Sequence, residues 1–424
     1  MRLKNDTYAV LRIRNFRNFS LYRLTLTIAL QMQTVIIGWQ VYALTKDPLS
    51  LGLVGLAEAI PALSIVLYAG HVADRKNRRN IILFSLITLF VCSLLFLYLS
   101  FRMTELYPAT GIYPLYAVIF LSGLARGFTG PATFAMLSEL VPRESLSNAA
   151  AWNSSVWQTG AIAGPALGGL LYGLVGLSNT FAISTTLMAL SIVALLLIRD
   201  MRGVPFSTRE PIVTSLLTGV RFVFKNQIVL GALSLDLFAV LFGGAVALLP
   251  IFASDILKVG PEGLGLLRAA PALGATVTGL WIAHKPLPES VGKRLFFAVG
   301  GFGICMIAFG LSTNFILSIV VLVVSGAFDS VSVVIRSTVL QLSTPDNMRG
   351  RVAAVNSMFI GSSNEIGEFE SGVAAKLLGV VPSVIFGGCM TIVTVLGTAK
   401  LAPGLLRLKK QSLLGRNDAV RTTA

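Results

Sequence analysis

Residues 70–79 read GHVADRKNRR, and this charged segment separates two apolar runs at residues 49–69 and 80–100. An α-helix needs roughly 20 mostly apolar residues to cross the hydrocarbon core of a bilayer, and each run is of this length. The basic side chains of the segment between them are costly to place in hydrocarbon. We therefore interpret residues 70–79 as a loop at the membrane surface that joins two transmembrane helices.

The same alternation of apolar runs and short breaks continues along the whole chain. Of its 424 residues 54% are hydrophobic and only 12% are charged, which is outside the composition of soluble domains. The expected fold class is therefore an all-α membrane protein with twelve transmembrane helices. These are predicted at residues 19–44, 49–69, 80–100, 112–135, 152–175, 178–198, 228–253, 262–284, 294–312, 315–338, 354–378 and 380–402.

The formal net charge of +15 is concentrated in alternate loops. Basic residues gather before the first helix and after the second, fourth, sixth, eighth, tenth and twelfth, whereas the opposite loops have few. This is the positive-inside pattern, which predicts an inner-membrane protein with both termini in the cytoplasm. The pattern explains the charge without nucleic acid, and no basic face with interleaved aromatic residues outside the membrane favours nucleic-acid binding.

The chain repeats itself at two nearby offsets. At an offset of 203, Pro142 aligns with Pro345 and Gly169 with Gly372; at 210, Gly55 aligns with Gly265. Internal repeats of this kind are common in secondary transporters. They predict two pseudo-symmetric six-helix bundles. The expected parts are an N-terminal bundle at 1–198, a cytoplasmic linker with an amphipathic helix at 199–227, a C-terminal bundle at 228–402 and a basic cytoplasmic tail at 403–424.

The 70–79 loop also carries a specific motif. Its residues Gly70, Asp74, Arg75 and Arg78 closely resemble the G-x-x-x-D-R-x-G-R loop of the major facilitator superfamily (MFS). The resemblance implies the MFS fold and a role for this loop in conformational change. The sequence departs from the pattern at Asn77, where the family usually has Gly. Because Asn tolerates a left-handed conformation, the turn is expected to be kept.

A second motif lies in the fifth predicted helix. Its small residues let another helix approach closely, and its proline bends the helix. The string is similar to the G-x-x-x-G-P-x-x-G-G antiporter motif of MFS exporters, and that resemblance implies export; packing alone would also account for it. The residues are Gly160, Gly164, Pro165, Gly168 and Gly169.

Charged residues inside the predicted helices are candidates for proton coupling or for the substrate cavity, because charge in hydrocarbon is costly. Residues aligned by the repeat carry opposite charge: Arg126 aligns with Asp329, and Glu58 with Arg268. The proposed coupling and cavity residues are Glu58, Arg126, Asp236, Asp329, Arg336, Glu365 and Glu368; Arg268 and Glu370 are further intramembrane charges.

Two of these candidates have a more definite expected role. Arg126 resembles the arginine in helix four of MFS antiporters, which is linked to proton coupling. Glu365 and Glu368 lie three apart on one helix face, so in a low dielectric both cannot easily be ionised and one is expected to hold a proton. The alternative is a structural ion-pair network with Arg336 or Arg268.

Segment 329–372 resembles the MFS branch of the enterobactin exporter and the macrolide efflux proteins. The expected function is proton-coupled efflux of a bulky amphipathic molecule, such as a siderophore or drug, by alternating access. An importer or facilitator of a small solute is the alternative. Neither an enzyme nor a metal site is expected, because no catalytic arrangement, phosphate-binding loop or metal-ligand spacing is found. The proton gradient is the expected energy source, with no cofactor, and the chain is expected to work as a monomer.

Overall fold

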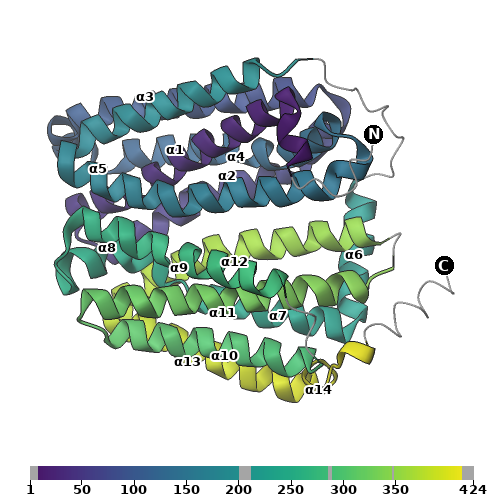
Figure 1. Ribbon diagram of the computed structural model, residues 1–424. Helices are drawn as coiled ribbons and strands as arrows, with labels where there is room; N and C mark the ends of the chain where they lie inside the picture. Colours follow the sequence, from purple (N-terminus) through teal and green to yellow (C-terminus); the bar gives the residue numbers. More distant parts are fainter. Residues whose placement is uncertain (1–7, 200–211, 285–288, 346–347, 413–424) are drawn as a thin grey trace. The chain divides into compact units, whose positions relative to one another are not determined.

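The computed structural model describes residues 8–199, 212–284, 289–345 and 348–412, apart from the side chains of residues 66, 67, 70, 71, 73–75, 104, 143, 212–216, 349 and 354. Within these ranges the regular secondary structure is entirely helical (Figure 1). The α-helices are α1 (Arg14–Thr45), α2 (Pro48–Arg75), α3 (Arg78–Thr110), α4 (Tyr113–Leu140), α5 (Leu146–Leu196), α6 (Ile212–Lys225), α7 (Gln227–Phe242), α8 (Leu249–Ile251), α9 (Gly260–Ala283), α10 (Val291–Leu311), α11 (Phe315–Leu342), α12 (Arg349–Leu378), α13 (Val380–Leu401) and α14 (Pro403–Leu406). Shorter turns are the 3₁₀ helices η1 (Ala9–Arg12), η2 (Arg143–Ser145) and η3 (Ala245–Leu248), and the π-helix η4 (Phe252–Ile256).

Every segment predicted to be a transmembrane helix contains helix in the structure. Among the described residues, nine helices are long and apolar enough to cross a membrane. One of them, α5, covers two predicted segments, 152–175 and 178–198, because it consists of two helices that meet at Gly176, whose φ of 82° and ψ of 175° are not helical. The helices α4 and α12 are not among the nine. They carry Arg126 and the cluster Glu365, Glu368 and Glu370.

The seventh predicted segment is not the single helix that its sequence favours. The helix α7 ends at Phe242, and the chain then passes through η3, α8 and η4. Gly243 and Gly244 lie at the break, and a Cβ added at Gly244 would come within 2.7 Å of the carbonyl oxygen of Gly367 in α12. The close approach of α12 therefore requires glycine here, and glycine also makes the helix easy to interrupt.

The described residues divide into two compact units. Unit 1 comprises the described residues within Met1–Lys46, Leu56–Thr208 and Val259–Ala269. Unit 2 comprises those within Asp47–Gly55, Arg209–Lys258 and Ala270–Ala424. Two helices are divided between the units: the first part of α2 and the last part of α9 belong to unit 2, and the rest of each belongs to unit 1. In unit 1, α1 packs on α5 and α3 on α4; in unit 2, α10 lies beside α11 and α13 (Figure 1).

Each unit has an apolar core and an apolar exterior. Phe16, Phe19 and Tyr22 of α1 are fully buried in unit 1, as are Val229 and Val339 in unit 2. Large apolar side chains also cover the outside of the helices, for example Phe134 (81% exposed), Leu377 (77%) and Phe297 (71%). Apolar surface of this extent indicates contact with a membrane rather than with water.

Candidate functional site

One intramembrane ion pair lies in unit 1 and joins α4 to α2. The guanidinium of Arg126 donates to the carboxylate of Glu58, and the two side chains are 29% and 22% exposed. The helices approach closely because Gly123 and Gly127 lack side chains; a Cβ at Gly123 would lie 2.8 Å from Cγ of Pro61. The sequence identifies both charges as intramembrane residues but does not predict that they pair. The G-x-x-x-G spacing of Gly123 and Gly127 beside Arg126 is the sequence signal for the close helix crossing.

A second ion pair lies in unit 2 and is more deeply buried. Arg336 of α11 pairs with Asp236 of α7, and the side chains are only 4% and 8% exposed. The Nε atom of Arg336 is buried and has no hydrogen-bond partner among the described residues. Each of these two buried charges stabilises the other, because either one alone would be a buried charge without compensation.

A third charge, Asp329, lies on the same helix as Arg336. Asp329, Ser332 and Arg336 are spaced three and four residues apart, which places them on one face of α11. The carboxylate of Asp329 is partly buried and makes no hydrogen bond or ion pair with the described residues. The hydroxyl of Ser332 is buried and likewise has no described partner. This face of α11 thus presents a carboxylate and a hydroxyl beside the arginine that Asp236 holds.

The carboxylate of Glu368 lies at a close crossing of α12 and the first part of α2, within unit 2. A Cβ added at Gly55 would lie 2.7 Å from Oε2 of Glu368, and one at Gly52 would lie 3.1 Å from Cα of Gly372. Glu365 contributes its backbone carbonyl to the same contact. Glu368 is therefore positioned where two helices come together through glycine.

The sequence repeat relates this crossing to another one in unit 1. There, α5 crosses α9, and a Cβ at Gly169 would lie 2.7 Å from Cα of Gly265. Gly169 aligns with Gly372, and Gly265 with Gly55. The position of Glu368 corresponds to Pro165, and the α5–α9 crossing carries its carboxylate at a different place: the side chain of Glu262 in α9 lies against Gly173 of α5.

Polar contacts of α1 add residues that sequence reasoning missed. The amide of Gln33 donates to the hydroxyls of Ser93 (2.7 Å) and Ser184 (3.3 Å), and all three residues are buried. The neighbouring carbonyl of Thr34 accepts a 3.0 Å hydrogen bond from Arg268, which ties α9 to α1 in unit 1. A polar residue inside an apolar helix is the only sequence signal for the Gln33 network.

The prediction of a left-handed conformation at Asn77 is wrong. Asn77 has φ −61° and ψ 114°, and its side-chain oxygen accepts the backbone N–H of Asn80 at 3.3 Å. Asn77 is thus the N-cap of α3, a role that a glycine, having no side chain, cannot perform by hydrogen bonding. The predicted loop at residues 70–79 is mostly helix, because α2 continues through Gly70 to Arg75 and α3 begins at Arg78, so only Lys76 and Asn77 join the two helices. The side chains of Asp74 and Arg75 lie outside the described residues.

The arginines at the start of α3 hold unit 1 together. Arg78 forms an ion pair with Glu139 near the end of α4, and both side chains are mostly buried. Arg79 donates to the carbonyl oxygens of Leu196 (2.8 Å) and Leu195 (3.4 Å) at the end of α5. Both carbonyls belong to the last turn of α5, where the regular helical hydrogen bonds end, so Arg79 acts as a cap; the Leu195 carbonyl also accepts from the backbone N–H of Ile198 (3.1 Å).

Most of the antiporter-type motif of α5 packs against α1 in unit 1, whereas Gly169 lies at the crossing with α9. A Cβ at Gly160 would press on the side chain of Thr27, and one at Gly168 would lie 2.9 Å from Cα of Met32. Gly164 faces Ile28 in the same way, and Pro165 is an interior residue of the helix. Close helix packing is therefore what these small residues accomplish in the structure.

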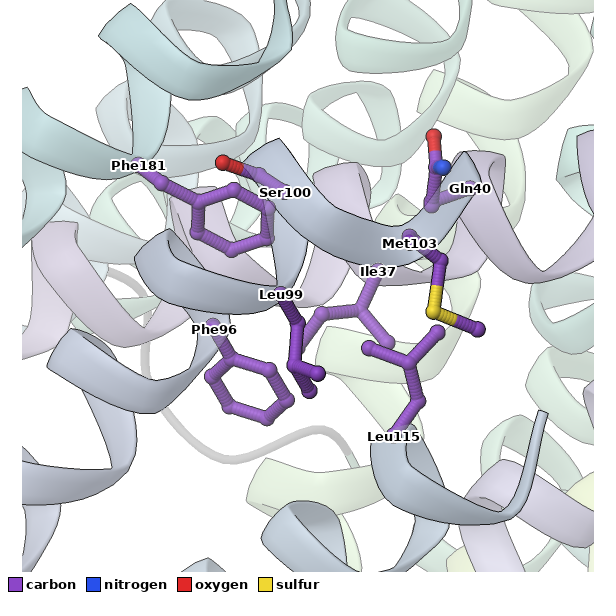
Figure 2. Close-up of a pocket in the computed structure, with 8 residues that line it drawn as sticks. All are labelled: Ile37, Gln40, Phe96, Leu99, Ser100, Met103, Leu115 and Phe181. Atoms are coloured by element: carbon purple, nitrogen blue, oxygen red, sulfur yellow. The ribbon is translucent and has the colours of Figure 1, made fainter. Parts of the chain in front are cut away.

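A small cavity in unit 1 lies among α1, α3, α4 and α5 (Figure 2). It has space of about 10 Å³, which is enough for roughly one water molecule. The rings of Phe96 and Phe181 line one side, and Gln40 and Ser100 supply its polar groups (Figure 2). The cavity is too small for a bulky solute. No group of three or more metal-ligating side chains is close enough to hold a metal ion in the part of the chain that the structure describes.

The profile of the Major Facilitator Superfamily matches residues 20–367. The "Enterobactin exporter EntS" of Shigella flexneri is 26% identical over 340 residues, which are 80% of this chain and 79% of that protein. Its counterpart in Shigella boydii serotype 4 is 28% identical over 343 residues, with the same two coverages.

Solved structures resemble the chain in fold. A POT family transporter in complex with 5-aminolevulinic acid has a TM-score of 0.70 at 14% identity, covering 92% of this chain and 96% of that one. The inward-open xylose transporter XylE from E. coli has a TM-score of 0.67 at 12% identity, covering 98% and 100%. At such identities the likeness shows the fold alone.

Proposed function

Because this chain belongs to the Major Facilitator Superfamily, whose profile spans residues 20–367, we propose that it is a proton-coupled exporter of a bulky amphipathic small molecule, such as a siderophore or drug. In this proposal twelve transmembrane helices form two bundles that give alternating access to one substrate site. The chain lies in the inner membrane as a monomer with both termini in the cytoplasm. The proton gradient supplies the energy, and no cofactor takes part.

The observation that carries the proposal is a carboxylate–arginine pair inside the helices of each unit. Glu58 pairs with Arg126 in unit 1, and Asp236 with Arg336 in unit 2. Intramembrane charges are costly and usually serve ion or substrate pathways. A proton that neutralises a carboxylate removes its attraction for the arginine, so protonation can change which helix contacts are most stable.

Two further carboxylates are suited to carry the proton. Asp329 makes no ion pair with a described residue and shares a helix face with Arg336. Glu368 lies at the crossing of α12 on Gly55, where its carboxylate is in direct contact with α2. In this proposal, proton uptake and release at Glu368 change how closely α2 and α12 pack.

The direction of transport is inferred from the relatives. The curated relatives are exporters of enterobactin by name, whereas the structural neighbours include a xylose transporter. The higher identity and long coverage of the exporters favour efflux. Import of a small solute on the same fold is the second possibility.

Transport direction and cargo can be tested together in a bacterial host that lacks its major efflux pumps. Expression of the chain is expected to lower the accumulation of at least one compound in a panel of siderophores and amphipathic drugs, and a protonophore should restore that accumulation. If expression instead raises accumulation of a solute, the chain is an importer.

Proton coupling can then be measured with that compound in proteoliposomes under a pH gradient. Asp329→Asn and Glu368→Gln are each expected to lower gradient-driven transport at least about tenfold, a loss of about 1.4 kcal/mol in the coupled step, because neither amide can exchange a proton. The matched control is Glu105→Gln, which alters an exposed carboxylate–arginine pair with Arg102 (66% and 53% exposed) and should leave transport unchanged. Full gradient-driven transport by both Asp329→Asn and Glu368→Gln would refute these assignments.

A further inference from the structure

A groove of about 530 Å³ opens in unit 1 where α2 ends and α3 begins. This volume is within the range of roughly 300–1,000 Å³ that small-molecule sites occupy. Its walls come from three helices and the loop between two of them. The lining residues are Tyr68, Val72, Lys76, Asn77, Asn80, Ile81, Phe84 and Phe128.

The groove is apolar at one end and polar at the other. At the apolar end, the rings of Tyr68 and Phe128 meet edge to face at 6.3 Å, and Tyr68 and Phe84 are 62% and 72% exposed. At the polar end lie the exposed side chains of Lys76 and Asn80. Aromatic residues beside a basic side chain at a helix end are typical of the boundary between hydrocarbon and headgroups.

The basic residues with described side chains between the end of α2 and the start of α3 differ in what they contact. Arg78 is held by Glu139, and Arg79 by the carbonyls at the end of α5. The side chain of Lys76 is exposed and lines the groove, and it makes no hydrogen bond or ion pair with a described side chain; its backbone N–H donates to the carbonyl of Val72 (2.9 Å). Its ammonium group is therefore placed within reach of a ligand in the groove.

The start of α3 adds a second source of positive potential at the same end. Asn77 caps this helix of 33 residues through its side-chain oxygen. That leaves the amide N–H₂ of Asn77 as a donor, and the first backbone N–H groups of the helix carry its positive dipole. A phosphate is the group that such an arrangement together with a lysine binds well.

We propose that this groove binds an anionic phospholipid of the adjoining leaflet. The phosphate lies between Lys76 and the N-terminus of α3, and an acyl chain lies over Tyr68 and Phe84. A soluble phosphate compound would use the polar end but leave the exposed aromatic end without a partner, which is why a lipid fits the groove better. The proposal does not depend on the transported solute.

The test is lipid binding to the full-length protein, measured by native mass spectrometry with phosphatidylglycerol or phosphatidylcholine. Lys76→Gln is expected to lower phosphatidylglycerol binding about fivefold, since one lysine near an anionic headgroup contributes about that factor. Phe84→Ala should also lower it, because the acyl chain loses apolar contact. The matched control is Lys293→Gln, which removes an exposed lysine of α10 in unit 2 that is remote in sequence from the groove.

Each outcome decides the proposal. A selective loss in Lys76→Gln and Phe84→Ala, with Lys293→Gln unchanged, supports it. Equal loss in Lys76→Gln and Lys293→Gln would show only general attraction of anionic lipid to a basic protein and would overturn it. Competition by glycerol 3-phosphate as effective as that by phosphatidylglycerol, with Phe84→Ala unchanged, would assign the groove to a soluble phosphate compound instead.

Discussion

Replacing Arg336 by Leu is expected to destabilise the protein by about 3–5 kcal/mol, because it leaves the carboxylate of Asp236 buried without a partner. The native pair has side chains that are 4% and 8% exposed, so little water can compensate. The double variant Asp236→Leu with Arg336→Leu removes both charges and is expected to recover most of the loss. The measurement is the apparent melting temperature of the purified protein in one detergent.

The comparison between single and double variants separates charge from packing. A double variant as unstable as Arg336→Leu would show that the arginine stabilises unit 2 by its volume rather than by its charge. Arg102→Leu provides the control, because its pair with Glu105 is exposed and such pairs contribute only about 0–1 kcal/mol.

Gly326→Ala is expected to cost about 1–3 kcal/mol and to impair transport, because α11 crosses α9 at this residue with no room for a side chain. A Cβ here would lie 2.7 Å from the Cα atom of Pro271, and one at Gly274 would lie 2.7 Å from the carbonyl carbon of Val323. Backbone atoms on both sides cannot move aside as a flexible side chain could. The helices would have to separate along their length.

Gly397→Ala supplies the matched control with the opposite sign. Gly397 lies in α13 with nothing within 4 Å of an added Cβ. Alanine in a helix interior is favoured over glycine by about 0.5–1 kcal/mol, so this variant is expected to raise the melting temperature. If Gly326→Ala raised it as well, the crossing of α9 and α11 would be looser than the structure shows. Thermal unfolding of the two variants under identical conditions makes the comparison.

The differences between expectation and structure have local physical causes. The seventh predicted helix is interrupted at Gly243 and Gly244, where Phe302 of α10 and the backbone of α12 come close, and hydrophobicity alone gives no warning of these contacts. Asn77 caps α3 rather than adopting a left-handed turn, because its side chain finds the N–H of Asn80. In both cases a contact with another group decided between conformations that the residue itself permits.

The sequence by itself determined the membrane class of the protein, the positions of its helical segments, the internal repeat and the residues that carry charge inside helices. These properties depend on the length and polarity of each segment, so each can be recognised without knowing its neighbours. The 70–79 loop was sufficient to indicate the superfamily that the profile then identified.

Only the tertiary structure decided which charges meet. It pairs Arg126 with Glu58 and Arg336 with Asp236, although the repeat aligns Arg126 with Asp329. Pairing depends on how closely two helices approach, and that distance is set by small residues far away in the chain, such as Gly123 opposite Pro61. The same holds for residues 70–79. The composition of this segment shows a row of positive charges, but only the tertiary structure pairs Arg78 and Arg79 with other groups and leaves Lys76 exposed at the groove.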